Sequence, residues 1–227
     1  MRQIKDFSGI TQMKIETYLA LDYYQKIVER LRGKKVLDVG CVDDGEIGAN
    51  EIRLWNHWFI VKMGREVVGI DIREGPLRQL KRLGFKVKKM DAQRINFRER
   101  FDVVFAGELI EHLPNPGMFL VSAARVLRKE GQIILSTPNP FSLSRLVRVV
   151  QSLTNEPAVN PDHTMYFSPQ NIKTLAEKCK LQVVKIDYAH FPFTQQRLLV
   201  KLNQIGCKIL GERFKEQMLV FIKTAND

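Results

Sequence analysis

Apolar residues follow two different periods along this chain, and segments of the two periods alternate. Short runs rich in valine and isoleucine are each followed by a segment whose apolar residues recur every three or four positions. This order is typical of parallel strands joined by crossover helices. The strands are expected at residues 35–39, 66–70, 86–90, 101–106, 132–136, 182–187 and 218–223. The sequence therefore predicts an α/β fold built on a mostly parallel sheet of seven strands.

The segments between these strands are expected to be helical. The expected helices cover residues 11–32, a stretch from Ile52 to Met63, a short stretch from Leu77 to Leu83, and residues 116–130, 168–180 and about 198–209. Glycines directly follow several of them, as at Gly64 and Gly131, where a left-handed residue can end a helix. Ser168 and Pro169 predict a helix start, because a capping hydroxyl precedes a proline at the first helical position.

Residues 141–165 interrupt the alternation with a basic amphipathic stretch that carries Arg145 and Arg148, followed by an Asn/Pro-rich loop. No internal repeat and no low-complexity linker divides the chain. We therefore expect one domain over residues 1–227, with a helical lead at 1–33 and a lid-like insertion at 141–167.

Composition narrows the class of protein. The chain has 227 residues, of which 44% are hydrophobic and 27% are charged, as in ordinary water-soluble proteins. No apolar run is long enough to span a bilayer, and the first residues lack the apolar stretch of a secretory signal. Three widely spaced cysteines, Cys41, Cys179 and Cys207, form no metal-type pair and fit a reducing compartment. We expect a cytoplasmic protein.

The net charge is +11, which leaves two interpretations open. A strongly basic protein can bind nucleic acid or another anionic partner. The basic residues are nevertheless spread along the chain rather than clustered, which favours an ordinary surface rich in lysine and arginine.

Acidic residues recur where the predicted strands end. Asp38 lies at the end of the first strand, and Asp71, Asp91 and Glu108 follow the second, third and fourth. Ligands of open parallel sheets bind outside these carboxyl ends. A carboxylate after the second strand can accept both hydroxyls of a ribose, and one after the third can accept the amine of adenine. The turn after Asp38 lacks the G-x-G-x-x-G pattern that a pyrophosphate needs, and its acids favour a cationic cofactor.

These residues resemble the class I S-adenosylmethionine-dependent methyltransferases. VLDVGC resembles the first motif of that family, VVGIDI the second and KKMDAQ the third, while FDVVFAGELIEHLPNPGMFL and GQIILSTPNP resemble the fourth and fifth strands with their loops. The resemblance runs from residue 35 to 140 and is weaker through DHTMYFSPQNIKTLAEKCKL. It implies a Rossmann-like, doubly wound sheet with an antiparallel last strand and helices on both faces.

The resemblance also implies the residues that bind S-adenosylmethionine, and these are Asp38, Gly40, Cys41, Asp71, Ile72, Asp91, Ala92 and Glu108. One departure lies in the first turn, where Val42 replaces the second glycine of the family and the following loop, residues 43–58, is longer than usual. Trp55 and Trp58, which flank His57, are expected to pack in the core or a lid.

The acceptor side is expected at Glu111, His112 and His163, which we take as the catalytic residues. The ExxEH spacing of residues 108–112 resembles two metal-assisted groups, the ubiquinone-type O-methyltransferases and the small-RNA 2′-O-methyltransferases, in which a further histidine, here His163, completes a divalent metal site. EHL followed by proline also occurs in metal-free methyltransferases, where the histidine is a general base or only a structural residue. We expect no resident metal, although a divalent ion stays an alternative.

The function expected is methyl transfer from S-adenosylmethionine to an oxygen, or a nitrogen, of a small molecule, glycan or lipid precursor. An RNA methyltransferase is the first alternative, favoured by the charge and weakened by the lack of an RNA-binding module or a basic-aromatic stripe. A catalytically silent protein that binds S-adenosylmethionine is the second, because of Val42.

Overall fold

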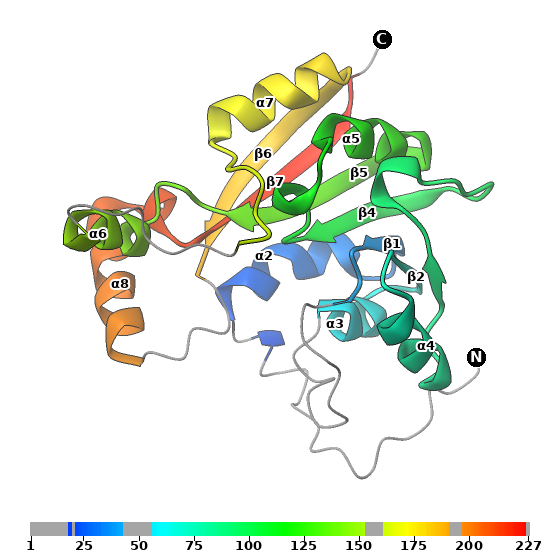
Figure 1. Cartoon of the computed structure of the whole chain (residues 1–227), viewed down its shortest axis with the longest axis horizontal. Coiled ribbons are helices and arrows are strands. Elements are labelled where there is room, and N and C mark those ends of the chain that lie inside the picture. The colour runs from blue at the N-terminus through cyan, green and yellow to red at the C-terminus, as the bar shows by residue number, and fades with distance from the viewer. Residues whose placement is uncertain (1–17, 20, 43–55, 153–160, 191–196, 226–227) are drawn as a thin grey trace.

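The structure is a computed structural model that describes residues 18–19, 21–42, 56–152, 161–190 and 197–225. Its centre is one seven-stranded sheet (Figure 1). The strands are β1 (Lys35–Val39), β2 (Glu66–Asp71), β3 (Val87–Lys89), β4 (Phe101–Gly107), β5 (Leu127–Pro138), β6 (Leu181–Ala189) and β7 (Gln217–Thr224). Their order across the sheet is β3-β2-β1-β4-β5-β7-β6. Six strands run in the same direction and β7 runs opposite to them, which confirms the predicted architecture.

Helices cover both faces of the sheet. The helices α5 (Pro116–Arg125) and α7 (Pro169–Lys178) pack on one face, and α2 (Asp22–Leu31) and α3 (Asn56–Met63) pack on the other. The helix α4 (Glu74–Arg82) packs beside β3 through a smaller apolar cluster. The described ranges also contain three short 3₁₀ helices, which are η2 (Ala92–Arg94), η3 (Ile110–His112) and η4 (Glu212–Phe214).

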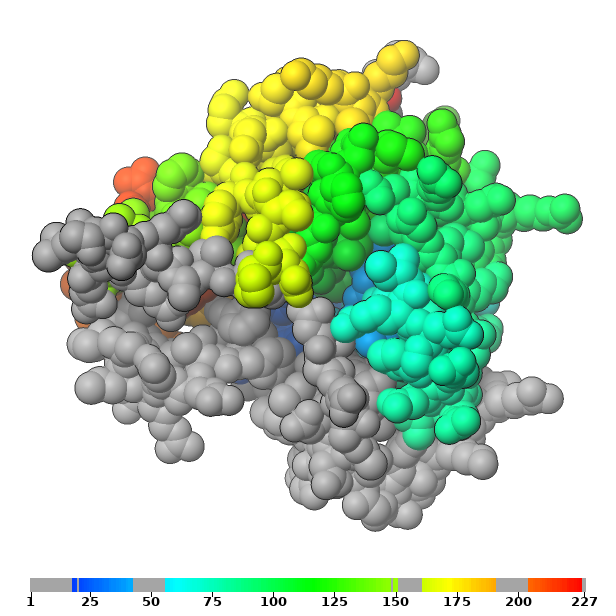
Figure 2. All heavy atoms as spheres, in the orientation of Figure 1, coloured from blue at the N-terminus to red at the C-terminus, as the bar shows by residue number. Residues whose placement is uncertain are grey.

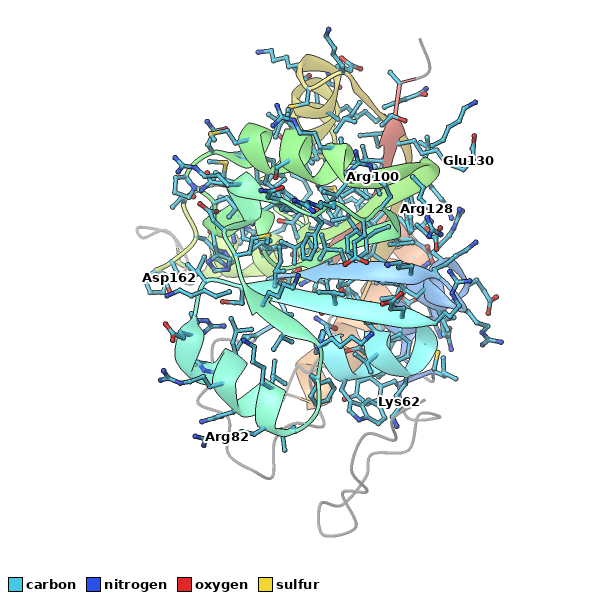
Figure 3. The ribbon with its side chains drawn as sticks, turned by 90° about the vertical axis from the view of Figure 1, so that its right-hand side faces the viewer. Lys62, Arg82, Arg100, Arg128, Glu130 and Asp162 are labelled. Atoms are coloured by element: carbon cyan, nitrogen blue, oxygen red, sulfur yellow. The ribbon has the colours of Figure 1, made fainter. Side chains whose placement is uncertain are left out.

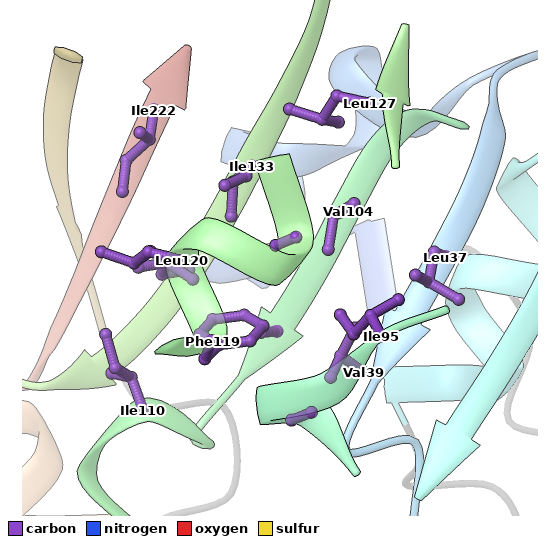
Figure 4. Packing of buried hydrophobic residues seen from close by; sticks show 14 of the residues in the cluster. Leu37, Val39, Ile95, Val104, Ile110, Phe119, Leu120, Leu127, Ile133 and Ile222 are labelled. Carbon is purple, nitrogen blue, oxygen red and sulfur yellow. The ribbon is translucent and has the colours of Figure 1, made fainter. Parts of the chain in front are cut away.

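The two cores arise from the alternation of side chains along each buried strand. In β4, Val104 faces α5 and α7, whereas Val103 and Phe105 face α2 and α3. Successive side chains of a strand point to opposite faces, so a strand covered on both sides is apolar at nearly every position. Figure 4 shows Phe119 and Leu120 of α5 packed over the sheet residues of the first core.

One predicted element was wrong. The helix expected over residues 116–130 ends at Arg125, and β5 already begins at Leu127. Leu127 pairs with Phe101, and the register then shifts before Val103 pairs with Gln132. Val126 and Leu127 are both buried, and two adjacent apolar residues fit a helix end as well as a strand start.

The predicted start of α7 is confirmed, because the Ser168 hydroxyl accepts a hydrogen bond from the backbone N–H of Asn171 at 3.2 Å. The amphipathic stretch after β5 forms α6 (Leu143–Ser152), which packs against α8 (Arg197–Leu210) at one end of the molecule in Figure 1. The predicted helical residues 11–17 and Ile52 to Trp55 lie outside the described residues. No helix of the described ranges is long and apolar enough to cross a membrane.

Candidate functional site

Four acidic residues from four neighbouring strands meet at one edge of the sheet. Asp38 lies at the end of β1, Asp71 ends β2, Asp91 follows β3, and Glu108 follows β4. The strand order reverses between β1 and β4, and a reversal of this kind opens a crevice for a ligand. The predicted cofactor residues are therefore gathered at one site by the strand order.

The turn after β1 has a backbone that needs glycine. Gly40 has φ of +73°, and the N–H groups of Gly40 and Cys41 donate to the Ile70 carbonyl at 2.9 and 3.1 Å. A Cβ on Gly40 would lie 3.0 Å from Cδ1 of Leu109, so a side chain there is strained by the conformation and needs Leu109 to shift. Gly40 thus keeps the turn after β1 narrow and leaves no side chain between this turn and a ligand.

Val42 occupies the position where the resemblance expects a glycine. Its backbone is not left-handed, since Glu108 and Lys180 alone among the described non-glycine residues have positive φ. The Val42 N–H donates to Asp71 Oδ2 at 3.3 Å, and the Arg73 guanidinium donates to the Val42 carbonyl. The turn therefore accommodates a branched residue and ties it to the end of β2.

Asp38 and His57 form a buried pair next to this turn. Nδ1 of His57 lies 2.7 Å from Asp38 Oδ2, and both side chains are almost fully buried. Burial raises the pKa of the Asp38 carboxyl, while the hydrogen bond from His57 opposes the increase. Nε2 of His57 is also buried and has no partner among the described residues.

The ends of β2 and β3 place further predicted cofactor residues. Asp71 Oδ1 accepts from the Arg73 N–H at 2.8 Å, and the next side chain, Ile72, is 64% exposed. Asp91 caps η2 by accepting from the Gln93 N–H at 2.8 Å, which leaves Ala92 buried behind it. An exposed isoleucine beside an acid is a surface on which a flat ring can lie.

Cys41 packs with the apolar cluster under α4. Burial is the main cause that raises the pKa of its thiol far above the ordinary range, and the charges of Asp38 and Asp71 add to it. A thiol in this environment stays protonated and is a poor nucleophile.

Glu108 is held in a strained position after β4. Its φ is +50°, its Oε1 accepts from the Ser136 hydroxyl at 2.9 Å, and its Oε2 accepts from the Gln217 amide at 3.0 Å. Burial raises the pKa of Glu108 to about 7. Non-glycine residues persist in such a conformation where their surroundings hold them in place, often at functional sites.

Glu111 lies one turn further along, inside η3. It is 1% exposed, and its Oε2 accepts from the Thr137 hydroxyl at 3.1 Å, whereas its Oε1 has no partner among the described residues. Burial raises the pKa of Glu111 to about 9, and the charge of Glu108 adds to the increase. Glu111 is therefore protonated at neutral pH.

His112 and His163 face each other across the site. Their ring centroids are 4.6 Å apart at an interplanar angle of 85°, and Nδ1 of His112 lies 3.2 Å from the Asp162 carbonyl oxygen. The segment that carries His163 is anchored at Thr164, whose N–H and hydroxyl both donate to the Glu111 carbonyl at 2.9 Å. In Figure 2 this yellow segment meets the green surface around η3.

One ligand-type atom each from Glu111, His112 and His163 lies within 4.8 Å of the other two. The three predicted catalytic residues are thus brought together, although 52 positions separate Glu111 from His163 along the chain. Glu108 is not part of this group, and its two oxygens bond Ser136 and Gln217.

Several residues that hold the site are not among those predicted from the sequence. Ser136 bonds Glu108 and accepts from the Tyr23 hydroxyl of α2 at 3.0 Å, while Thr137 holds Glu111. Two adjacent hydroxyls at the end of a buried strand were a usable signal. Gln217 had none, since it reaches Glu108 only because β7 lies beside β5.

The chain is similar to several known proteins. The family described as "Methyltransferase domain" matches residues 13–186 of the chain. A ubiquinone biosynthesis O-methyltransferase of Dechloromonas aromatica is 30% identical over 200 residues, which cover 83% of this chain and 82% of that protein. Another protein of that name, from Photobacterium profundum, is 28% identical, with coverage of 83% and 81%.

Solved structures share the fold. A SAM-dependent methyltransferase from Archaeoglobus fulgidus superposes with a TM-score of 0.60 at 19% identity and covers 96% of this chain and 100% of that one. The magnesium protoporphyrin IX methyltransferase of Synechocystis, solved with bound SAH, gives a TM-score of 0.52 at 14% identity, with coverage of 95% and 80%. With the matched domain and the site above, the chain belongs to the methyltransferase domain family and is a class I enzyme that uses S-adenosylmethionine.

Proposed function

We propose that the chain methylates a hydroxyl oxygen of a small-molecule acceptor, with glycans and lipid precursors included in that class. The observation that carries the proposal is the group of Glu111, His112 and His163 beside the cofactor edge of the sheet. The relatives named O-methyltransferases support oxygen as the acceptor atom.

The side chains at the strand ends fit S-adenosylmethionine, which supplies a methyl group activated on a sulfonium. Asp71 would hold the ribose hydroxyls, and Asp91, Ala92 and Ile72 would hold the adenine. Gly40 and Cys41 would line the methionine part, with Asp38 beneath them and Glu108 beside it. The fit rests on the Gly40 turn, which a Cβ would fill, and on carboxylates suited to hydroxyl and amine donors.

His112 is the base that we infer for the acceptor. A carbonyl oxygen can only accept a hydrogen bond, so the contact with the Asp162 carbonyl places the imidazole proton of His112 on Nδ1. The lone pair of the neutral ring is then on Nε2. S-adenosylmethionine would supply the methyl group to the hydroxyl oxygen, with the electron pair of the broken carbon–sulfur bond left on its sulfur, and Nε2 of His112 would take the hydroxyl proton.

Glu111 and His163 would orient the acceptor rather than remove its proton. Glu111 keeps its own proton at neutral pH, because burial raises its pKa to about 9. One of its oxygens is buried without a partner among the described residues, and the hydroxyl of an acceptor that enters between η3 and the segment of His163 would supply the missing hydrogen bond. Thr164 fixes the segment that carries His163 onto Glu111, so the acceptor would be held between η3 and this segment.

A divalent metal is the second candidate, because Glu111, His112 and His163 offer three ligand atoms close together. The position of Glu108 argues against it, since Glu108 is not among the three grouped residues and Glu111 offers the only carboxylate in that group. Turnover that is lost with a chelator and restored by Mg²⁺ would establish the metal route in place of the base.

We also infer that the described parts of the predicted insertion, residues 141–152 and 161–167, cover the acceptor, within a chain that works as one domain. The support is the Thr164 contact with Glu111 and the Arg145 guanidinium, which lies 4.2 Å from the centroid of the Tyr166 ring. The free thiols of Cys41, Cys179 and Cys207 suit the cytoplasm as its location.

The decisive experiment is transfer of a labelled methyl group from S-adenosylmethionine into fractionated lysate, with and without RNase. Label in RNase-resistant small molecules supports the proposal, and label that RNase removes would make the chain an RNA methyltransferase. No label at all would favour a silent cofactor-binding protein. In the His112→Gln variant, kcat should fall about 100-fold or more, while affinity for the cofactor stays the same.

A further inference from the structure

A cavity lies on the face of the sheet that α5 covers. It has a volume of about 670 Å³ and lies between α5 and residues 93–100, which follow Asp91. None of the residues assigned above to the cofactor or the acceptor lines it. In Figure 3, Asp162 beside His112 lies at the left edge of the molecule, whereas Arg100 at this hollow lies in the upper part, right of centre.

Three arginines line this cavity, and no carboxylate does. They are Arg94, Arg100 and Arg125, and all three are exposed. Within the described ranges, none of them hydrogen-bonds or pairs with another side chain, whereas Arg78 and Arg128 pair with Glu74 and Asp102. Three guanidinium groups around one hollow leave a positive charge that the protein does not neutralise. Such groups match phosphate oxygens through paired hydrogen bonds.

The floor of the cavity is apolar. Ile95, Phe97 and Val126 are buried there, and Met118 is 44% exposed at its wall. The Ser122 hydroxyl also lines the cavity, but it donates to the Ala92 carbonyl at 2.7 Å and leaves no donor for a ligand. The arginines would therefore bind the charged group of a ligand, and the apolar residues would contact its carbon part.

The size of the cavity separates two kinds of anion. A volume of several hundred Å³ is typical of sites for small molecules. A single-stranded nucleic acid needs a longer basic groove with aromatic rings for successive bases, and Phe97 is the one aromatic residue that lines this cavity. A compact ligand fits these observations better.

We propose that this cavity binds the phosphate or pyrophosphate group of a small organic ester, with Arg94, Arg100 and Arg125 around the phosphate and the carbon part on Phe97 and Met118. The site is separate from the methyl-transfer site. The proposed phosphate site does not depend on the identity of the acceptor proposed above.

Calorimetric titration at 0.15 M salt tests this with inorganic phosphate, inorganic pyrophosphate and octyl phosphate as probes. Pyrophosphate and octyl phosphate should both bind more tightly than phosphate. Arg94→Gln, Arg100→Gln and Arg125→Gln should each weaken pyrophosphate binding roughly tenfold, because each removes a charge-assisted hydrogen bond. Met118→Gln should weaken octyl phosphate and leave pyrophosphate unchanged.

Arg82→Gln is the matched control, because Arg82 is exposed on α4, away from Arg100 in Figure 3, and its loss changes the net charge equally. Binding that is absent in the unaltered protein, or that weakens as much in Arg82→Gln, would overturn the proposal. A short single-stranded oligonucleotide that binds more tightly than pyrophosphate, and loses affinity in the three arginine variants, would assign the site to nucleic acid instead.

Discussion

Nδ1 of His57 lies 2.7 Å from Oδ2 of Asp38, and this contact joins α3 to β1 inside the protein. Removal of the imidazole leaves a carboxylate buried without its partner, which is costly in the folded state. We expect His57→Leu to lower the free energy of unfolding by about 3 kcal/mol. Asp38→Asn should cost less in the His57→Leu background than in the unaltered protein, as urea denaturation of the double-mutant cycle will show.

An exposed ion pair provides the control for that cycle. Lys86 and Glu66 lie 3.3 Å apart with side chains 69% and 38% exposed, so their coupling should stay below about 1 kcal/mol. Equal coupling energies in the two cycles would mean that burial adds nothing to the Asp38–His57 contact.

The stability of the protein should fall as the pH rises. Burial raises the pKa of Glu108 to about 7 and that of Glu111 to about 9, above the ordinary value of 4.5. The folded protein then binds more protons than the unfolded chain from pH 4.5 to about 7 at Glu108 and to about 9 at Glu111, and stability declines through each of these ranges by up to about 1.4 kcal/mol per pH unit.

Glu111→Gln removes the larger of these two shifts. Its Tm should match that of the unaltered protein near pH 5 and exceed it near pH 9, as thermal unfolding across the pH range can measure. Glu130→Gln on the exposed part of β5 is the control and should not alter the pH dependence. A Glu111→Gln variant with an unchanged pH profile would show that Glu111 is ionised in the folded protein.

A side chain at Gly40 should destabilise the turn after β1. The Gly40→Ala variant places a Cβ at φ of +73° and 3.0 Å from Leu109, so we expect a loss of about 1–2 kcal/mol in stability and weaker cofactor binding. Gly75→Ala in α4 is the matched control, because its Cβ meets open space and alanine favours a helix by up to about 1 kcal/mol. If both variants behave alike in denaturation, the Gly40 turn is not what restricts this site.

Asp71 should determine the affinity for the cofactor. Asp71→Asn keeps the size of the side chain but loses its charge, and we expect S-adenosylmethionine to bind about 10- to 100-fold more weakly. Calorimetric titration with S-adenosylmethionine, S-adenosylhomocysteine and NAD measures this, with Glu74→Gln on the exposed start of α4 as control. NAD should not bind, and tight NAD binding would refute the assignment of the turn.

The sequence alone determined the seven strands, the helix start at Ser168 and the acids at the strand ends. Those features depend on local spacing, because the period of apolar residues records which faces are buried. The same spacing could not predict that the helix ends at Arg125, because the buried apolar residues Val126 and Leu127 fit a helix as well as a strand. There, the pairing of Leu127 with Phe101 decided the structure.

Only the tertiary structure decided which residues meet. Glu108 and Gln217 are 109 positions apart and touch because β7 returns to the sheet beside β5. His57 reaches Asp38 because α3 packs across β1, and three separate arginines line one cavity because α5 lies against residues 93–100. Contacts of this kind depend on strand order and helix packing, which no local pattern of residues records.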